Sequence, residues 1–176
     1  FAVDIYQRDL DITRYNVPFL RHPFVAFYTS RGCPAFCTYC LWPQTFGSHK
    51  WRTRSSQNVV AELKRAFELF PQVREIFFDD DTFAWGKTRT LDLCRHMQKL
   101  KFTWSCTCRV HADFEMLKAM KEAGCRLLIV GFESGDPTIL KNIKKGTTVK
   151  QAHTFMRNCR QLGIHVHGDF IIGLPG

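Results

Sequence analysis

The sequence alternates short apolar runs with longer amphipathic stretches, and this alternation limits the folds open to the chain. The runs predict strands, and the stretches between them space apolar residues three and four apart, as helices do. The predicted strands are 24–29, 74–79, 102–107, 126–132 and 166–172. The predicted helices are 57–70, 87–100, 113–123 and 148–162, with a shorter one over 137–144. Repeated β-α units of this kind predict an α/β fold on a parallel sheet.

Right-handed connections between these units would wind the sheet into an open barrel or a doubly wound sheet, and the periodicity fits both. Residues 24–176 form one predicted domain. Residues 1–23 are of mixed polarity, without a clear period, so we expect a linker that arrives from an upstream domain. The chain starts at Phe1 and stops after a turn signal at Gly176. We therefore expect a fragment of a longer protein. On its own, this fragment should not turn over substrate efficiently.

The formal charge of +9 is a reason to consider nucleic acid as a partner. However, Lys and Arg are scattered over the predicted helices. The densest group lies beside the end of the short helix and consists of Lys141, Lys144, Lys145 and Lys150. Cations suit that end of a helix, so we expect no nucleic acid substrate. No apolar run reaches the roughly 18–20 residues of a membrane-spanning helix.

Three of the eight cysteines crowd into residues 33–40, and the other five fall on or beside predicted helices and strands. Secreted disulfide proteins are usually short and spread their cysteines over loops. The crowding instead indicates a metal site in a reducing compartment. We expect a cytoplasmic protein, either free or peripheral to the inner membrane.

Unusual residues follow each predicted strand, where loops of a parallel α/β fold converge on a ligand. These segments are 31–40, 78–83, 108–111, 131–135 and 172–176. The loops at the opposite ends of the strands are plain by comparison. One functional rim is therefore predicted.

The first of these segments spaces its cysteines as Cys33-x3-Cys37-x2-Cys40. Soft thiolates suit iron–sulfur clusters and zinc. A structural zinc site normally closes with four protein ligands, and His49 is a distant candidate for the fourth. Three cysteines on a [4Fe–4S] cluster leave one iron open to a substrate group, which is a catalytic arrangement. We favour the open cluster; zinc or inert thiols are the alternatives.

With Tyr39 before its last cysteine, this motif resembles that of the radical S-adenosylmethionine (SAM) superfamily. The resemblance implies a partial TIM-type (β/α)6 barrel, truncated here after the fifth strand, with a [4Fe–4S] cluster and SAM as cofactors. In that family the reduced cluster cleaves SAM to methionine and a 5′-deoxyadenosyl radical, which abstracts hydrogen from substrate. An electron donor such as flavodoxin or ferredoxin is also implied.

The resemblance also assigns contacts with SAM. Phe78, Asp79 and Asp80 would lie near the methionine amino group, which a carboxylate suits. Glu133 would meet the ribose hydroxyls or the methionine moiety. The alternatives are an acidic loop that faces water and an ordinary salt bridge.

Four further contacts follow from the same resemblance. Arg109 would lie near the SAM carboxylate, unless it forms a structural ion pair. Ile172 and Gly173 belong to a segment whose backbone would run along the adenine, and Tyr39 would contact or pack beside the adenine.

Other candidate residues have simpler explanations. Cys106 and Cys108 are more typical of buried thiols than of an auxiliary site. His165 and His167 share one face of a strand, where hydrogen bonding is commoner than a metal pair. His111 is a weak candidate for proton transfer.

Similarity extends to several other segments of the chain. These are Cys40 to Gly47, Trp51 to Ser55, Phe78 to Phe83, Asn142 to Gly146 and His167 to Gly176. They resemble the cobalamin-binding class of the family, and within it the proteins of hopanoid side-chain modification of the bacteriohopanetetrol cyclitol ether type. This implies a small-molecule or lipid substrate, with cobalamin bound by the intact protein.

The fragment lacks the Asp-x-His-x-x-Gly signature of cobalamin binding. The alternatives are a cobalamin-dependent methyltransferase of another small molecule, a tRNA-modifying radical SAM enzyme and a zinc-stabilised binding module.

Overall fold

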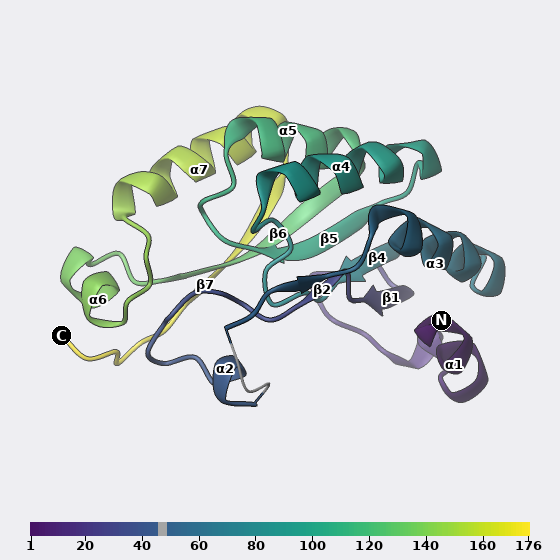
Figure 1. Ribbon diagram of the computed structural model, residues 1–176, viewed down its shortest axis with the longest axis horizontal. Coiled ribbons are helices and arrows are strands. Elements are labelled where there is room, and N and C mark those ends of the chain that lie inside the picture. The colour runs from purple at the N-terminus through teal and green to yellow at the C-terminus, as the bar shows by residue number, and fades with distance from the viewer. Residues whose placement is uncertain (46–48) are drawn as a thin grey trace.

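The computed structural model describes residues 1–45 and 49–176, and its centre is a five-stranded parallel sheet (Figure 1). The strands are β1 (Phe24–Phe27), β4 (Glu75–Phe78), β5 (Trp104–Cys108), β6 (Cys125–Glu133) and β7 (His165–Phe170). Their order in the sheet follows their order in the chain. A doubly wound sheet reverses this order at a switch point. The unbroken order is that of a barrel wall, which confirms the predicted α/β barrel class.

Four helices cover one face of the sheet (Figure 1). They are α3 (Ser56–Leu69), α4 (Lys87–Met97), α5 (Phe114–Glu122) and α7 (Val149–Leu162), close to the predicted ranges. Local capping explains where α5 and α7 begin. The Asp113 carboxylate accepts from the Met116 amide at 2.9 Å, and Thr148 forms a capping box with Gln151. Gly163 ends α7 in the left-handed conformation, as its position predicted.

The shorter elements lie outside this helical layer. They are α1 (Ala2–Asp9), α2 (Trp42–Thr45), α6 (Pro137–Asn142) and the 3-10 turns Ile12–Arg14 and Gln98–Leu100. None of the helices within 1–45 and 49–176 is long and apolar enough to cross a bilayer.

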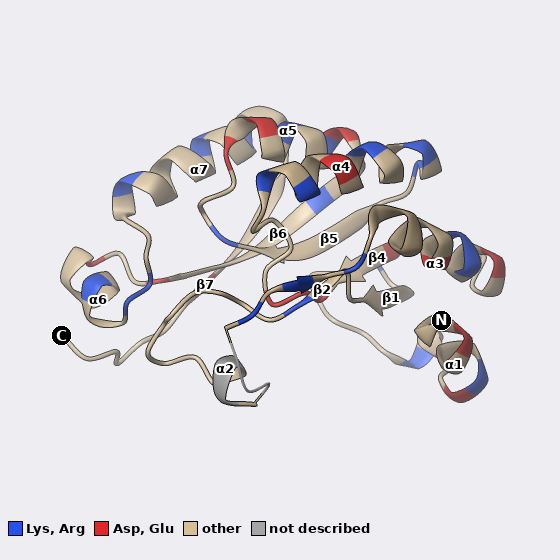
Figure 2. Ribbon diagram, viewed as in Figure 1, with Lys and Arg blue, Asp and Glu red and all other residues tan. Residues whose placement is uncertain are grey.

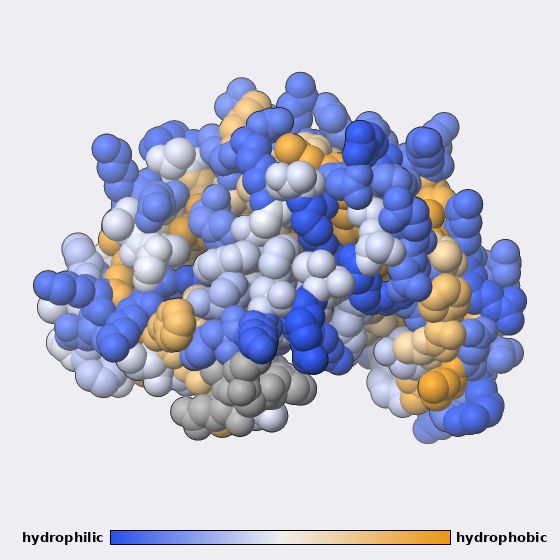
Figure 3. Space-filling model, viewed as in Figure 1, coloured by the Kyte–Doolittle hydropathy of each residue, from blue (hydrophilic) through white to orange (hydrophobic). Residues whose placement is uncertain are grey.

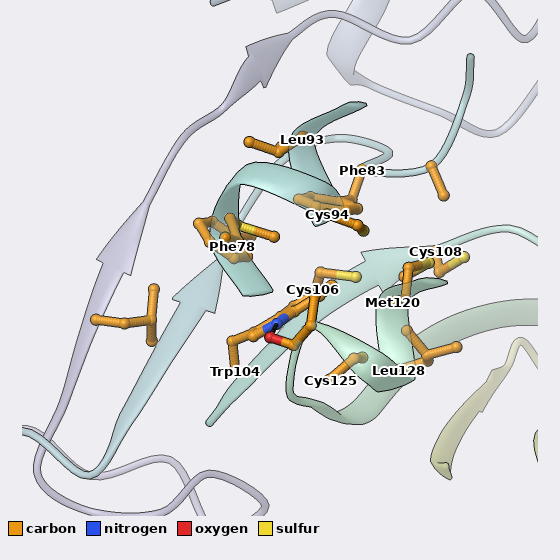
Figure 4. Packing of buried hydrophobic residues seen from close by; sticks show 14 of the residues in the cluster. Phe78, Phe83, Leu93, Cys94, Trp104, Cys106, Cys108, Met120, Cys125 and Leu128 are labelled. Carbon is orange, nitrogen blue, oxygen red and sulfur yellow. Dashed lines mark hydrogen bonds between the residues drawn. The ribbon is translucent and has the colours of Figure 1, made fainter. Parts of the chain in front are cut away.

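The core lies between the sheet and the helices, and an aromatic trio forms its centre (Figure 4). Phe78, Phe83 and Trp104 are fully buried, with ring centroids 5.1–5.3 Å apart. The Trp104 indole N–H donates to the Ala123 carbonyl at 2.8 Å, so this polar group is satisfied inside the core. Outside the core, Lys and Arg are scattered along the helices, as the sequence predicted, and acidic residues lie among them on α3, α4 and α5 (Figure 2). The visible face is correspondingly mostly hydrophilic (Figure 3).

The prediction of a linker over 1–23 is wrong as to secondary structure, because the helix α1 forms there and packs against α3. Val3 is fully buried, and its amide donates to the buried Glu62 carboxylate at 3.3 Å. Arg54 pairs with the same carboxylate at 2.6 Å. A helix of two turns with one buried side chain carries too little periodicity to be read from sequence.

The sequence analysis also missed a small antiparallel ribbon at the carboxyl end of β1. Its strands are β2 (Ser30–Arg31) and β3 (Arg52–Thr53), paired Ser30 to Thr53 and Arg31 to Arg52. Strands of two residues have no detectable alternation. The ribbon closes the base of the loop that contains the three clustered cysteines.

Candidate functional site

The loops after β1, β4, β5 and β6 meet at the carboxyl ends of the strands, as parallel topology requires. The cysteine loop, residues 32–42, follows the ribbon strand β2. Its first residue, Gly32, has φ of +90°, and a Cβ there would lie 2.0 Å from the Lys50 carbonyl oxygen. Only glycine tolerates both conditions. The Gly32 amide donates to the Asp81 carboxylate at 2.6 Å, which ties the loop to the end of β4.

The three cysteines of this loop are free, half-buried thiols. The Cys40 amide donates to the Cys37 carbonyl at 3.2 Å, and the Thr38 amide donates to the Ile143 carbonyl at 3.0 Å. The loop is therefore a tight turn docked on the segment after α6. Burial raises the pKa of the Cys33 thiol. Binding to a metal would offset this effect, because a coordinated thiol is deprotonated.

Arg109 lies against the cysteine loop, and its expected contact with the SAM carboxylate stays a prediction. One guanidinium nitrogen is 3.6 Å from the Cys37 sulfur, and the other donates to the Lys145 carbonyl. The charge of Arg109 opposes part of the effect of burial on the pKa of the Cys33 thiol. A cavity of about 300 Å³ adjoins these groups, and its wall includes Ala35, Phe36, Arg109 and His111.

Glu133 and Tyr39 also come together here, through a residue that the sequence analysis assigned elsewhere. The Lys145 ammonium lies 2.7 Å from the Glu133 carboxylate and donates to the Tyr39 hydroxyl at 3.1 Å. Burial, followed by the adjacent Glu133 carboxylate, raises the pKa of the Tyr39 hydroxyl. We expected Lys145 only as one of the cations beside a helix end, whereas the structure buries it at 5% exposure. Its sequence signal, one Lys among four, does not distinguish it from its neighbours.

Phe78 ends β4, and it and the two residues that follow it play different parts. The Phe78 ring is wholly in the core, and the expected contact of this residue with the methionine amino group of SAM stays a prediction. Asp80 is also buried, and its carboxylate accepts from the Thr29 amide at 2.6 Å and the Ser30 hydroxyl at 2.8 Å. It therefore supports the start of the cysteine loop. Asp79 is partly exposed and accepts from the Tyr28 hydroxyl at 2.8 Å.

The segment after β7 is connected to the same group of residues through its backbone. The Ile171 amide donates to the Glu133 carbonyl at 3.0 Å. Ile172 is 99% exposed, and Gly173 has φ of +89°. The expected backbone contact of Ile172 and Gly173 with adenine stays a prediction.

The remaining candidates lie away from the cysteine loop or have ordinary partners. Cys106 and Cys108 are in the core (Figure 4), where burial raises the pKa of both thiols. His49 stacks on Phe36 at 4.1 Å between ring centroids. His167 contacts Asp169 at 3.3 Å. The structure does not test the motif residues Phe46 and Gly47, which lie outside the described residues.

The donor set fits a [4Fe–4S] cluster. Over 1–45 and 49–176, no three His, Cys, Asp or Glu side chains lie close enough together to hold a single metal ion. A four-iron cluster instead takes each thiolate at a separate corner. Cys33, Cys37 and Cys40 supply three such donors beside Arg109, and Arg109 neutralises part of their charge.

Such a fold and site define an α/β barrel wall with a three-cysteine loop at its catalytic edge. Comparison with known families gives the same answer, because residues 27–176 match the Radical SAM superfamily. The chain belongs to this superfamily. Membership confirms the predicted class of enzyme and its two cofactors, a [4Fe–4S] cluster and SAM.

Two similar curated proteins are methyltransferases. An uncharacterized methyltransferase of Pyrococcus horikoshii is 38% identical over 87% of this chain and 34% of its own length. The cytidylyl-2-hydroxyethylphosphonate methyltransferase of Streptomyces wedmorensis is 33% identical over 96% of this chain and 32% of its own. The chain thus spans about a third of the length of these relatives.

Solved structures agree with the fold. The cobalamin-dependent SAM radical enzyme OxsB, with aqua-cobalamin bound, superposes with a TM-score of 0.75 at 26% identity. The match covers 84% of this chain and 23% of OxsB. The methyltransferase TsrM of Kitasatospora setae superposes with a TM-score of 0.78, over 99% of this chain and 33% of TsrM. At 19% identity, the TsrM match concerns the fold alone.

Proposed function

We propose that the protein is a cobalamin-dependent radical SAM methyltransferase and that this chain carries its SAM-cleaving core. The observation that carries the proposal is the cysteine loop held against Arg109 at the carboxyl edge of the sheet. The similarity to the Pyrococcus and Streptomyces methyltransferases supports methyl transfer. The cobalamin bound by OxsB supports cobalamin as a cofactor beside the cluster and SAM.

Residues of the chain have separate roles in this proposal. Cys33, Cys37 and Cys40 would hold the cluster, which supplies the one-electron cleavage of SAM when both are bound. Arg109 adjoins the cavity of about 300 Å³ and would attract the SAM carboxylate. The partly exposed Asp79 carboxylate would accept from the SAM amino group.

Two classes of methyl acceptor follow from the relatives. The first is a polar small molecule, by likeness to the phosphonate methyltransferase. The second is a hopanoid lipid, by likeness to the hopanoid C-2 methylase of Rhodopseudomonas palustris, which is 29% identical over 94% of this chain. The finer expectation, the cyclitol ether step of hopanoid side-chain modification, stays a prediction. So do the flavodoxin or ferredoxin electron donor and the cytoplasmic location.

Anaerobic reconstitution tests the core of the proposal. We expect about four iron and four sulfide per chain, and 5′-deoxyadenosine after addition of SAM and a strong reductant. Cys37→Ala should abolish both the cluster and the formation of 5′-deoxyadenosine. Cys159→Ala, at a buried cysteine of α7, should retain the cluster. One zinc per chain without sulfide would instead support a zinc-stabilised binding module.

Methyl transfer is tested with the longest natural form of the protein, because the relatives are about three times longer. We would add methyl-labelled SAM, cobalamin and either hopanoid extracts or polar metabolite pools. Label in one pool identifies the acceptor class. Formation of 5′-deoxyadenosine without label in any acceptor would contradict methyl transfer and leave SAM cleavage standing.

A further inference from the structure

Lys145 is a buried lysine that joins three elements of the site. Its side chain is 6% exposed and that of its partner Glu133 is 7% exposed. Burial of a charge is costly unless the charge is paired and hydrogen-bonded. Here the ammonium contacts the Glu133 carboxylate and the Tyr39 hydroxyl, while the Lys145 carbonyl accepts from Arg109. One residue therefore contacts the cysteine loop, the end of β6 and the loop after β5.

The local backbone is built around this ion pair. Glu133 adopts φ of +65°, which is uncommon for a residue with a side chain. A Cβ at Gly131 would lie 2.2 Å from Glu133 Oε1 and 3.2 Å from Lys145 Nζ. The pair therefore packs against bare backbone. A glycine on this side and a strained glutamate beside it indicate that the position of the carboxylate is specified closely.

We propose that Lys145 is a positioning residue for SAM, acting through Glu133 and Arg109. Its ammonium donates to Glu133 Oε1 and so fixes the orientation of this carboxylate. Carboxylate oxygens accept hydrogen bonds from hydroxyl groups, and those of Glu133 would accept from the ribose hydroxyls of SAM. The backbone carbonyl of Lys145 accepts from the Arg109 guanidinium and so keeps that group beside Cys37. This inference rests on the proposed SAM-cleaving function and adds a residue that the motif does not contain.

Three variants test the proposal in reconstituted protein: Lys145→Met, Lys145→Arg and the control Lys141→Met, at an exposed lysine of α6 that does not line the cavity beside Arg109. All three retain the cysteines, so iron and sulfide contents should match the wild type. The Kd for SAM should rise about tenfold or more in Lys145→Met, on the scale of one charge-assisted hydrogen bond. It should rise less than about threefold in Lys145→Arg, because an Arg retains a donor and the charge. Lys141→Met should match the wild type.

The electron paramagnetic resonance spectrum of the reduced cluster provides a second readout. We expect the change caused by SAM to be altered in Lys145→Met and normal in Lys141→Met. A wild type that binds no SAM would refute the proposed function itself. A wild type that binds SAM, together with a Lys145→Met variant of equal Kd and equal spectrum, would refute only the positioning role.

A double-variant cycle covers the case in which Lys145→Met unfolds. Lys145→Met leaves a buried carboxylate unpaired, whereas adding Glu133→Gln removes that charge. The Tm of the cluster-free double variant should therefore recover most of the loss seen with Lys145→Met. If Lys145 acts through Glu133, the double variant should bind SAM no more weakly than Glu133→Gln alone. Multiplied losses in Kd would overturn this route.

Discussion

The hydrogen bonds of Asp80 allow a direct test of how the fold supports the cysteine loop. Its carboxylate is 1% exposed and accepts from the Thr29 amide at 2.6 Å, the Thr29 hydroxyl at 2.5 Å and the Ser30 hydroxyl at 2.8 Å. These donors belong to Thr29 and Ser30, where the chain passes from β1 into β2 and toward Cys33. Asp80→Ala removes the acceptor for all three.

The magnitude follows from the groups left behind. Each buried donor without a partner costs about 1–3 kcal/mol. The Thr29 hydroxyl oxygen still accepts from Arg89 at 2.6 Å, but its O–H loses its acceptor, as do the Thr29 amide and the Ser30 hydroxyl. We expect Asp80→Ala to lower the free energy of unfolding by about 3–5 kcal/mol. Asp80→Asn retains a carbonyl acceptor, so we expect a loss of about 1 kcal/mol at neutral pH.

The same site predicts a pH dependence. Burial raises the pKa of the Asp80 carboxyl above its ordinary value of 3.8, and the hydrogen bonds from Thr29 and Ser30 only partly offset it. The folded state then binds this proton more tightly than the unfolded state does. The contribution of Asp80 to stability is therefore largest below pH 3.8 and falls as the pH rises through the raised value. Asp80→Asn has no ionisable carboxyl at this site, so the stability of this variant relative to the wild type should improve with rising pH.

Urea unfolding followed by circular dichroism measures these differences, with pH varied from acid to neutral. Asp79→Ala is the matched control, because its carboxylate is partly exposed and accepts from the Tyr28 hydroxyl. We expect it to cost less than about 1 kcal/mol. A loss below about 1 kcal/mol in Asp80→Ala would refute the anchoring role. A difference between Asp80→Asn and the wild type that is constant with pH would refute the raised pKa.

Three further predictions concern the surroundings of the site. Glu75→Ala should cost about 3–5 kcal/mol in urea unfolding, because the buried carboxylate pairs with Arg126 at 2.8 Å; a cost near zero would contradict this. Gly124→Ala should lower the Tm sharply, because φ is +100° and a Cβ would lie 2.0 Å from the Phe102 carbonyl oxygen; an unchanged Tm would show that this turn adapts. Burial, followed by the charge of Arg109, lowers the pKa of the His111 imidazole below its ordinary value of 6.5. The contribution of His111 to stability is therefore lost as the pH falls through this lowered pKa. An NMR titration midpoint at or above 6.5 would contradict it.

Local patterns predicted the elements that carry the site. The strand and helix ranges follow from periodicity, and the caps at Asp113 and Thr148 follow from hydrogen bonds within one turn. The cysteine motif is local as well, since its donors lie within eight residues. Such signals depend on neighbours in the chain, and the sequence displays them directly.

The contacts that shape the site join residues far apart in the chain. Lys145 meets Tyr39 across 106 residues, and Asp80 meets Thr29 across 51. Periodicity over a helical turn carries no information at such distances. For this reason the sequence did not distinguish Lys145 from the other cations of its group, and it did not predict that Lys145 pairs with Glu133 or that Asp80 supports the loop.

The sequence by itself determined the parallel α/β class, the rim on which unusual residues gather and the three thiols that suit a cluster, because each depends on short-range pattern or donor chemistry. Only the tertiary structure decided that the strands follow one another as a barrel wall. It also decided which charged side chains are buried together around the cysteine loop. The physical reason is that burial and pairing depend on which distant segments pack against each other, and such packing is a property of the folded chain as a whole.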